Sequence, residues 1–195
     1  MKINRTNSGD HLAILFHKPK GVVVTRRDER GRRTVYDCLP GWVRDGGWIA
    51  IGRLDAETRG LLLFTRDGGL VERLTKPGKC VKTYEAWVRG RVTQDHARRI
   101  LDGISSKGEI LRAVRIEPKG GIGPKSRVEV RLDEGRNRHL RRMFGGLNDP
   151  ERGTPLKVLD LKRTGFGPIV LDIPSGAWRF LTVEESDKLL CSSIE

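Results

Sequence analysis

The fold of this chain is constrained most by its short strand-like segments. Turns separate these segments more often than helices do. Residues 12–16 (LAILF) and 60–65 (GLLLFT) are apolar runs that end in turns, as buried strands do. Residues 82–90 (KTYEAWVRG) and 126–132 (SRVEVRL) alternate apolar and polar side chains, as half-buried strands do. Since parallel strands need long crossover connections and few are present, we predict an α+β fold with a mainly antiparallel sheet.

Two further segments are strand candidates, namely residues 22–25 (VVVT) and 111–117 (LRAVRIE). A turn at 66–69 precedes a short helix that Pro77 ends. A second helix is expected over 94–102, with Thr93 as its N-cap and Gly103 as its stop. Its apolar face is predicted to consist of Ala97, Ile100 and Leu101. Thr182 and Glu185 have the spacing of a capping box that opens the last helix.

The charge of the chain favours a polyanionic partner. The net charge of +13 produces a positive field that attracts nucleic acid and weakens with salt. No long uncharged apolar run or terminal basic amphipathic helix supports a membrane partner, and the N-terminus lacks the apolar stretch of a signal peptide. We therefore expect a cytoplasmic protein without membrane contact.

Cysteine and histidine usage indicates neither disulfides nor metal. The three cysteines are an odd number without CxxC spacing, and the four histidines lie far from them in the sequence. Ordinary thiols in a reducing compartment are the expected interpretation.

Residues 52–68 (GRLDAETRGLLLFTRDG) contain one carboxylate, Asp55, between two arginines. Most such aspartates form surface ion pairs. This one precedes a core strand, where sites are often built, and a neighbouring arginine would keep it ionised as a nucleophile or base. A glycosidase or metal hydrolase would need a second acid or further ligands, and Glu57 is too close in sequence to face Asp55 across a sugar.

Residues 134–147 (EGRNRHLRRMFGGL) are a second candidate region. As a helix they would bury Leu140, Met143, Phe144 and Leu147, with arginines on the flanks. This could be a basic surface helix. Alternatively, Asn137 and the arginines line a phosphate groove and one arginine turns inward to hold a carboxylate. The charged segment 26–34 (RRDERGRRT) is likewise either a solvated loop or an arm over phosphates.

Five segments together resemble the RsuA/RluB/RluE/RluF family of ribosomal RNA pseudouridine synthases. They occur in the family's order between residues 14 and 185: HKPKGVVVT, GRLDAETRGLLLFTRDG, VKTYEAWVRG, EGRNRHLRRMF and LKRTGFGPIVLDIPSGAWRFLTVEE. The resemblance implies a pseudouridine synthase fold, with a mixed, mostly antiparallel sheet flanked by helices and an RNA-binding cleft. It assigns residues 10–191 to the catalytic domain, either one unit or two subdomains that share one sheet.

The resemblance also implies residue roles. Asp55 matches the catalytic aspartate, Tyr84 the tyrosine that packs against the flipped base, and Arg141 the basic residue that pairs with the aspartate. The base must leave its stack to react, an aromatic face replaces the lost stacking, and a guanidinium fixes the carboxylate. The isomerisation requires no cofactor and no metal. Leu161 is either pocket lining or plain core.

Several departures from the family pattern are present. His17 and His139 replace the usual Asn and Gln, and residues 147–155 (LNDPERGTP) form a longer loop than the family's turn. About ten residues precede the first strand, so no N-terminal S4 domain is expected and the chain looks most like the RluE branch, which acts on large-subunit ribosomal RNA.

Without an S4 domain, RNA recognition would depend on the basic surface of the catalytic domain. The residues predicted to contact RNA are Lys18, Lys20, Arg26, Arg27, Arg32, Arg33, Arg53, Arg136, Asn137, Arg138 and Arg142. We expect a monomeric enzyme that isomerises uridine in ribosomal RNA. The expected substrate is the large-subunit, 23S-type molecule. The alternatives are a non-catalytic RNA-binding or ribosome-assembly factor with the same fold and a synthase that acts on transfer RNA.

Overall fold

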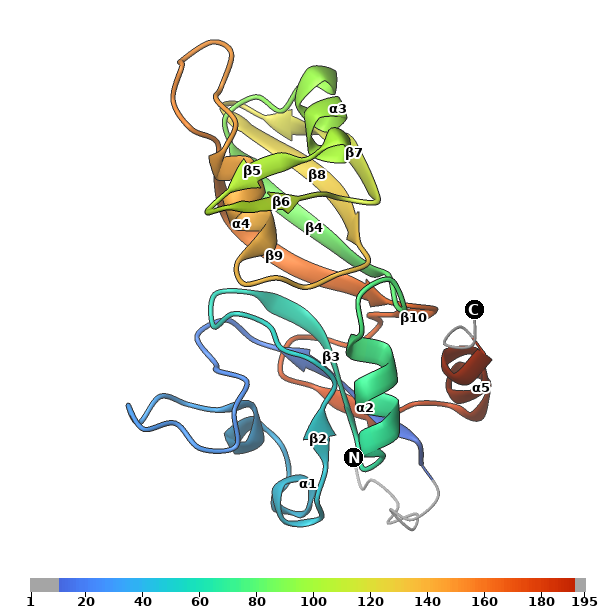
Figure 1. The fold of residues 1–195 in the computed structure, drawn as a ribbon. Coiled ribbons are helices and arrows are strands. Elements are labelled where there is room, and N and C mark those ends of the chain that lie inside the picture. The colour runs from blue at the N-terminus through green and yellow to red at the C-terminus, as the bar shows by residue number, and fades with distance from the viewer. Residues whose placement is uncertain (1–10, 192–195) are drawn as a thin grey trace.

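The computed structural model describes residues 11–191, and within them nine strands form one sheet (Figure 1). The strand order is β11-β1-β3-β9-β4-β8-β7, with β2 paired to β3 and β10 paired to β9. Apart from the β3–β9 contact, the named strand pairs of this sheet are antiparallel, which confirms the predicted fold class. The expected domain start at residue 10 and the terminus inspected for a signal peptide lie outside the described residues.

Most elements follow one another with short connections, but residues 19–34 between β1 and η1 and residues 146–156 between α4 and β9 are longer. The strands are β1 (Ala13–Lys18), β2 (Ile49–Ala50), β3 (Arg59–Thr65), β4 (Lys82–Arg89), β5 (Ile104–Ser106), β6 (Glu109–Leu111), β7 (Arg115–Ile122), β8 (Lys125–Leu132), β9 (Lys157–Phe166), β10 (Ile169–Val170) and β11 (Trp178–Phe180). The helices are η1 (Val35–Cys38), α1 (Gly41–Asp45), α2 (Gly68–Thr75), α3 (Gln94–Asp102), α4 (His139–Gly145) and α5 (Val183–Cys191). No helix among the described residues has the length and apolarity needed to cross a membrane.

The first half of the molecule is built on β1 and β3, which are buried on both faces. On one face, Leu63 packs in a cluster with Leu70 of α2 and Leu189 of α5. On the other face, Phe64 packs with Tyr36 of η1 and with Trp48. A strand that is covered on both sides needs apolar residues at successive positions, which explains the uninterrupted runs in the sequence.

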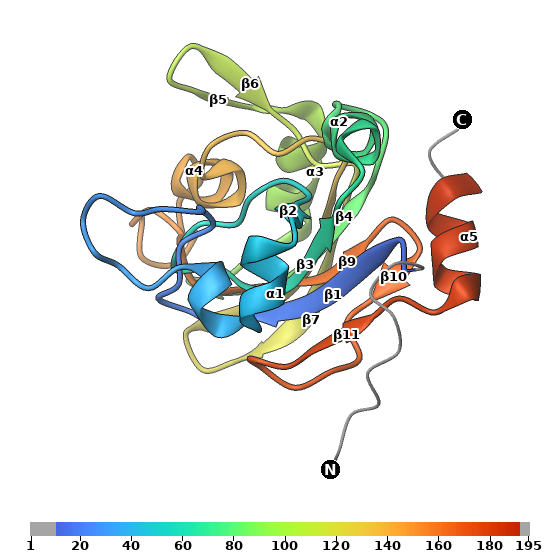
Figure 2. The same cartoon turned by 90° about the horizontal axis from the view of Figure 1, so that it is seen from below.

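The second half contains β4, β7, β8 and β9 with α3 and α4. Its core joins Val88 and Val130 of the sheet to Ile100 of α3 and Phe144 of α4. The predicted alternation of β4 is confirmed, since its side chains are buried at every second position. The N-cap Thr93 is also confirmed, because its hydroxyl accepts from the backbone of the third helical residue. Figure 2 shows the separate β5–β6 hairpin standing clear of the sheet.

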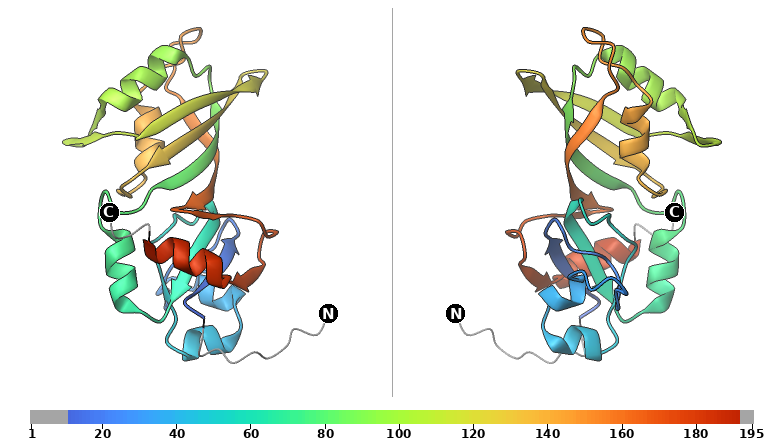
Figure 3. Two further views of the ribbon diagram at one scale, coloured as in Figure 1. Left: turned by 90° about the vertical axis from the view of Figure 1, so that its right-hand side faces the viewer. Right: turned by 90° about the vertical axis from the view of Figure 1, so that its left-hand side faces the viewer.

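The two halves meet at a narrow junction, visible as a waist in Figure 3. There β3 and β9 pair in parallel through only two residue pairs, Arg59 with Lys162 and Gly60 with Arg163. Gly60 has φ +115°, and a Cβ atom there would lie 2.3 Å from the Arg163 carbonyl oxygen. The chain crosses from α2 into β4 and returns along β9, so the second half is inserted within the first.

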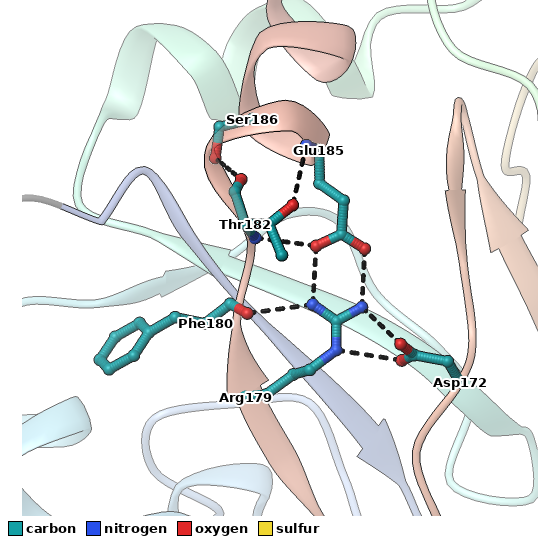
Figure 4. A network of polar contacts seen from close by, with 6 residues as sticks. All are labelled: Asp172, Arg179, Phe180, Thr182, Glu185 and Ser186. Atoms are coloured by element: carbon teal, nitrogen blue, oxygen red, sulfur yellow. Dashed lines mark hydrogen bonds and ion pairs between the residues drawn. The ribbon is translucent and has the colours of Figure 1, made fainter. Parts of the chain in front are cut away.

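A polar network attaches α5 to the edge of the first half (Figure 4). The Arg179 guanidinium of β11 donates to both Glu185 carboxylate oxygens, at 2.7 and 2.6 Å, and to Asp172 at 3.1 and 2.8 Å. The Thr182 backbone N–H donates to Glu185 at 2.9 Å, and the Glu185 N–H donates to the Thr182 hydroxyl at 3.1 Å. The predicted capping box is therefore confirmed.

Two local predictions were wrong. Residues 22–25 form no strand, since Val23 makes only an isolated bridge to Thr34. The predicted turn at 66–69 instead starts a helix, because the Asp67 carboxylate caps α2 from Gly68 onwards.

Two other predictions held only in part. In α3, Leu101 is 43% exposed and does not join Ala97 and Ile100 in the core. The residues from 111 to 117 are split, because β6 ends at Leu111 and β7 begins at Arg115.

Candidate active site

Asp55 lies in the loop between β2 and β3, at the junction of the two halves. The Thr58 N–H donates to the Asp55 carbonyl oxygen at 3.0 Å and closes a tight turn. From β1, the Lys18 ammonium donates to the carbonyl oxygens of Ala56 at 3.1 Å and Thr58 at 2.8 Å. The backbone that carries Asp55 is therefore fixed from inside the protein.

Lys18 is fully buried, which corrects its prediction as an RNA contact. Burial lowers the pKa of its ammonium to about 8, while the negative charge of Asp55 acts in the opposite direction. Its ammonium also donates to the Pro19 carbonyl oxygen at 3.0 Å, so backbone oxygens already occupy it. Lys18 instead supports the Asp55 loop and supplies a positive charge beneath it.

A cavity of about 70 Å³ opens beside Asp55 and is walled by both halves. Arg53, Asp55 and Thr58 come from the first half, and the residues from the second half include Tyr84, Leu132, Leu161, Gly135, Arg136, Arg138, His139, Leu140 and Arg141. Tyr84 is 8% and Leu161 5% exposed. Leu161 both lines the cavity and packs in the core, so the two interpretations of it are compatible.

Arg141 lines this cavity, but it does not form the expected ion pair with Asp55. Its guanidinium donates to the carbonyl oxygen of Val158 at 3.0 Å and that of Glu57 at 3.5 Å. Within residues 11–191, the half-exposed Asp55 carboxylate forms no hydrogen bond or ion pair. Arg141 therefore connects β9 to the Asp55 loop through backbone oxygens, which leaves the carboxylate open to a ligand.

The helix of the second candidate region is shorter than expected. It covers His139–Gly145, because Arg138 adopts a left-handed conformation, φ +48°, at its N-cap. Leu140, Met143, Phe144 and Leu147 are buried as predicted.

Most of the residues predicted to contact RNA are exposed near the cavity or on the 26–33 loop: Lys20, Arg26, Arg27, Arg32, Arg33, Arg53, Arg136, Asn137 and Arg138. Some have partners within the chain. Lys20 pairs with Asp160 at 2.5 Å, and Arg32 with Asp28 at 2.6 Å. Arg26 donates to the Trp48 carbonyl oxygen at 2.9 Å.

Arg142 is not positioned for RNA contact, contrary to its prediction. Its side chain is 13% exposed and pairs with Glu109 of the β5–β6 hairpin at 2.6 Å. It also donates to the Ser106 carbonyl oxygen at 2.5 Å. The guanidinium therefore holds the hairpin against α4.

Both histidines that depart from the family pattern are buried. Burial lowers the pKa of His17, whose Nδ1 lies 2.8 Å from the Ile173 carbonyl oxygen. Burial also lowers the pKa of His139, whose Nε2 lies 3.1 Å from the Arg112 carbonyl oxygen. Both side chains therefore favour the neutral form.

Sequence reasoning missed two buried cations, Lys82 and Arg163, which line a second cavity next to Tyr84. Lys82 occupies a buried-face position of the alternating β4 strand, and that anomaly was visible in the sequence. In the described part of the chain, no group of three His, Cys, Asp or Glu side chains is placed to hold a metal ion.

Comparison with known proteins identifies the family and the fold. The family model described as RNA pseudouridylate synthase matches residues 11–145. The chain belongs to this family. Among solved structures, one titled "Crystal structure of pseudouridylate synthase" superposes with a TM-score of 0.75 at 30% identity, covering 92% of this chain and 74% of that one. Human RNA Pseudouridylate Synthase Domain Containing 4 shares the fold, with a TM-score of 0.56 at 16% identity, covering 94% of this chain and 90% of that one.

Curated relatives of this pseudouridylate synthase family member carry a more specific name. Ribosomal large subunit pseudouridine synthase B of Vibrio cholerae is 39% identical over 179 residues, which are 90% of this chain and 53% of that protein. The Pseudomonas aeruginosa protein of the same name is 38% identical over 180 residues, 90% of this chain and 45% of that protein. The chain thus spans about half the length of these relatives. Since they are named synthase B, the assignment to the RluE-like branch stays a prediction.

Proposed function

We propose that this chain isomerises a uridine of large-subunit ribosomal RNA to pseudouridine, with Asp55 as the catalytic nucleophile or base. The observation that carries the proposal is the placement of Asp55, whose unpaired carboxylate lines a cavity together with Tyr84 and Leu161. A flipped uracil would stack on the Tyr84 ring, while the exposed arginines at the rim would contact phosphates. The names of the relatives support ribosomal RNA as the substrate.

The reaction defines what the site must do. The bond from the sugar C1′ to uracil N1 breaks, the base turns, and a bond to C5 forms while the C5 proton is lost and N1 gains a proton. Product and substrate are isomers, so no co-substrate is consumed. We propose that the chain acts as a monomer in the cytoplasm, without a metal, and that residues 10–191 are the catalytic domain.

The test is pseudouridine mapping by carbodiimide labelling and primer extension. Ribosomal RNA would be taken from cells with the gene, without it, and with Asp55→Asn. We expect one uridine to lose its signal in both the deletion and the variant, and the rate of purified Asp55→Asn to fall by roughly 10⁴-fold. Asp187→Asn, the same change on an exposed face of α5, is the control and should retain the signal.

Two outcomes would contradict the proposal. Unchanged ribosomal RNA in the deletion, with RNA binding retained, would favour a non-catalytic assembly factor. Loss of pseudouridine from transfer RNA instead would contradict ribosomal RNA as the substrate.

A further inference from the structure

A second cavity, of about 110 Å³, lies next to the one that contains Asp55. The two cavities share Arg53, Tyr84 and Gly135 as lining residues, so they meet beside the tyrosine. Gly52 and Gly135 both line the second cavity. A polynucleotide backbone could approach closely there because neither residue carries a side chain.

The second cavity is lined by two buried positive charges. Lys82 is 6% and Arg163 2% exposed. Lys82 lies on the buried face of β4 two positions before Tyr84, and Arg163 lies opposite Tyr84 in the β4–β9 register. The alternating pattern of these strands calls for apolar side chains at such positions, so the charges interrupt a core face.

Among the described residues, neither charge has an ion-pair partner. Arg163 Nε donates to the Leu61 carbonyl oxygen at 2.7 Å, but its buried Nη2 has no partner among the described residues. Lys82 Nζ makes a long bond of 3.3 Å to the Asp133 carbonyl oxygen. Within residues 11–191 no carboxylate forms an ion pair with either side chain.

The two cations also oppose one another. Burial is the main cause of a lowered pKa at Lys82, and the charge of Arg163 acts in the same direction, while Cys80 and Asp133 act against it. Both lie beside the Phe166 ring, at 5.7 and 5.2 Å from its centroid, which offsets only part of the cost of burying them. An anion from outside the chain would complete the site.

We propose that this cavity binds a phosphate of the RNA substrate, next to the nucleotide whose base lies against Tyr84. This inference rests on the proposed function, since phosphodiesters are the anions that RNA supplies. The Arg163 guanidinium and the Lys82 ammonium are suitable donors to phosphate oxygens. The contact would place the reacting nucleotide relative to Asp55, so Lys82 and Arg163 are positioning residues.

The test compares uridine with uridine 5′-monophosphate and uridine 3′-monophosphate as probes. Their dissociation constants would be measured at low salt by NMR titration of the wild-type chain, Lys82→Met and Arg163→Lys. We expect at least one monophosphate to bind the wild type roughly tenfold more tightly than uridine does. In Lys82→Met this ratio should fall below about two, with the affinity for uridine unchanged. Lys125→Met, the same substitution at an exposed lysine of β8, should keep the full ratio.

Thermal unfolding measures whether the substitutions impair folding. Because Lys82 is a buried charge that forms no ion pair within residues 11–191, Lys82→Met should unfold at the same or a higher temperature than the wild type. Inorganic phosphate should raise the unfolding temperature of the wild type more than that of Lys82→Met, relative to chloride at equal ionic strength. Arg163→Lys keeps the positive charge but lacks the second guanidinium donor. The ratio of monophosphate affinity to uridine affinity should therefore fall only in part.

The outcomes separate this inference from the proposed function. Equal affinities for uridine and both monophosphates, or a ratio that persists in Lys82→Met, would overturn the phosphate site even if the chain forms pseudouridine. A ratio that depends on Lys82 would support the site even if ribosomal RNA proved not to be modified.

Discussion

Lys18 shows how one buried side chain can prepare a catalytic loop. Its ammonium holds the backbone at Ala56 and Thr58, on the carboxyl side of Asp55. It thereby fixes the position of the loop and contributes a positive charge near the carboxylate. If the negative charge of Asp55 were removed, the lowering of the Lys18 pKa by burial would be opposed less strongly.

We expect the pKa of Lys18, about 8 in the wild type, to fall further in Asp55→Asn. The reason is that the Asp55 charge is the largest influence raising it against burial. The measurement is an NMR titration of ¹³Cε-labelled lysine between pH 6 and 11, with the signals of exposed lysines as internal controls. A Lys18 pKa that is the same in both proteins would show that Asp55 does not interact with it.

At this scale the sequence identified the right cavity residues but not all their partners. Asp55, Tyr84 and Leu161 do converge, because each belongs to a motif and precedes or lies on a core strand. Lys18 and Arg142 are predicted as RNA contacts because their charge is visible in the sequence. Their actual partners, Thr58 and Glu109, lie 40 and 33 positions away, and local patterns do not encode such contacts.

Among the elements, the contact between β3 and β9 depends on a glycine. Gly60→Ala would place a methyl group 2.3 Å from the Arg163 carbonyl oxygen at φ +115°. We expect a loss of about 3 kcal/mol in the free energy of unfolding, measured with urea. The control is Gly68→Ala in the first turn of α2, where the new methyl group meets open space and the change should cost nothing measurable. Equal effects of the two substitutions would contradict this explanation.

The attachment of α5 depends on its cap. Thr182→Ala removes the hydroxyl that accepts from the Glu185 N–H, and it should lower the free energy of unfolding by about 1 kcal/mol. Ser186→Ala removes a hydroxyl that donates back to the Thr182 carbonyl oxygen at 2.8 Å, and it should be nearly neutral because such a bond within a helix adds little stability. Thermal unfolding of both variants distinguishes a cap from a general loss of hydroxyl groups. If Ser186→Ala cost as much as Thr182→Ala, the capping box would not be the source of stability.

The elements that the sequence predicted well are those with a strong period. β4, with its alternating residues, and β3, with its apolar run, lie where expected. Residues 22–25 failed because three valines favour a strand only when a partner edge is available, and here Val23 meets only Thr34. The glycines at 68 and 69 favour a turn, but Asp67 accepts from the Leu70 N–H and caps a helix that begins at Gly68, a local signal that the turn interpretation overlooks.

For the whole molecule, the exposed cations should make RNA binding depend on salt. The slope of log affinity against log salt should be roughly 0.7 per phosphate neutralised on single-stranded RNA. Arg138→Gln should therefore reduce the slope by about 0.7, because this exposed side chain lines the Asp55 cavity. Arg142→Gln should leave it unchanged, because Arg142 is bound to Glu109. Filter binding of a uridine-containing oligonucleotide between 50 and 300 mM salt would measure both slopes.

The overall fold class followed from the number and spacing of strands, and two subdomains that share one sheet were one of the expected arrangements, but the residues that join the two halves were not predictable. The two-pair junction between β3 and β9 joins residues about 100 positions apart, and nothing near Gly60 or Arg163 in the sequence announces it. The position of the active site between the halves was therefore accessible only from the folded chain.

The pairing of β1 with β11 has a consequence for synthesis on the ribosome. β3 covers one edge of β1 soon after it emerges, but the other edge waits for residues 178–180, about 160 positions later. At a translation rate of roughly 5–20 residues per second, that edge stays open for about 10 to 30 s. An unpaired apolar strand is a template for other chains. The nascent protein is therefore vulnerable to aggregation through β1 until its last strand is made.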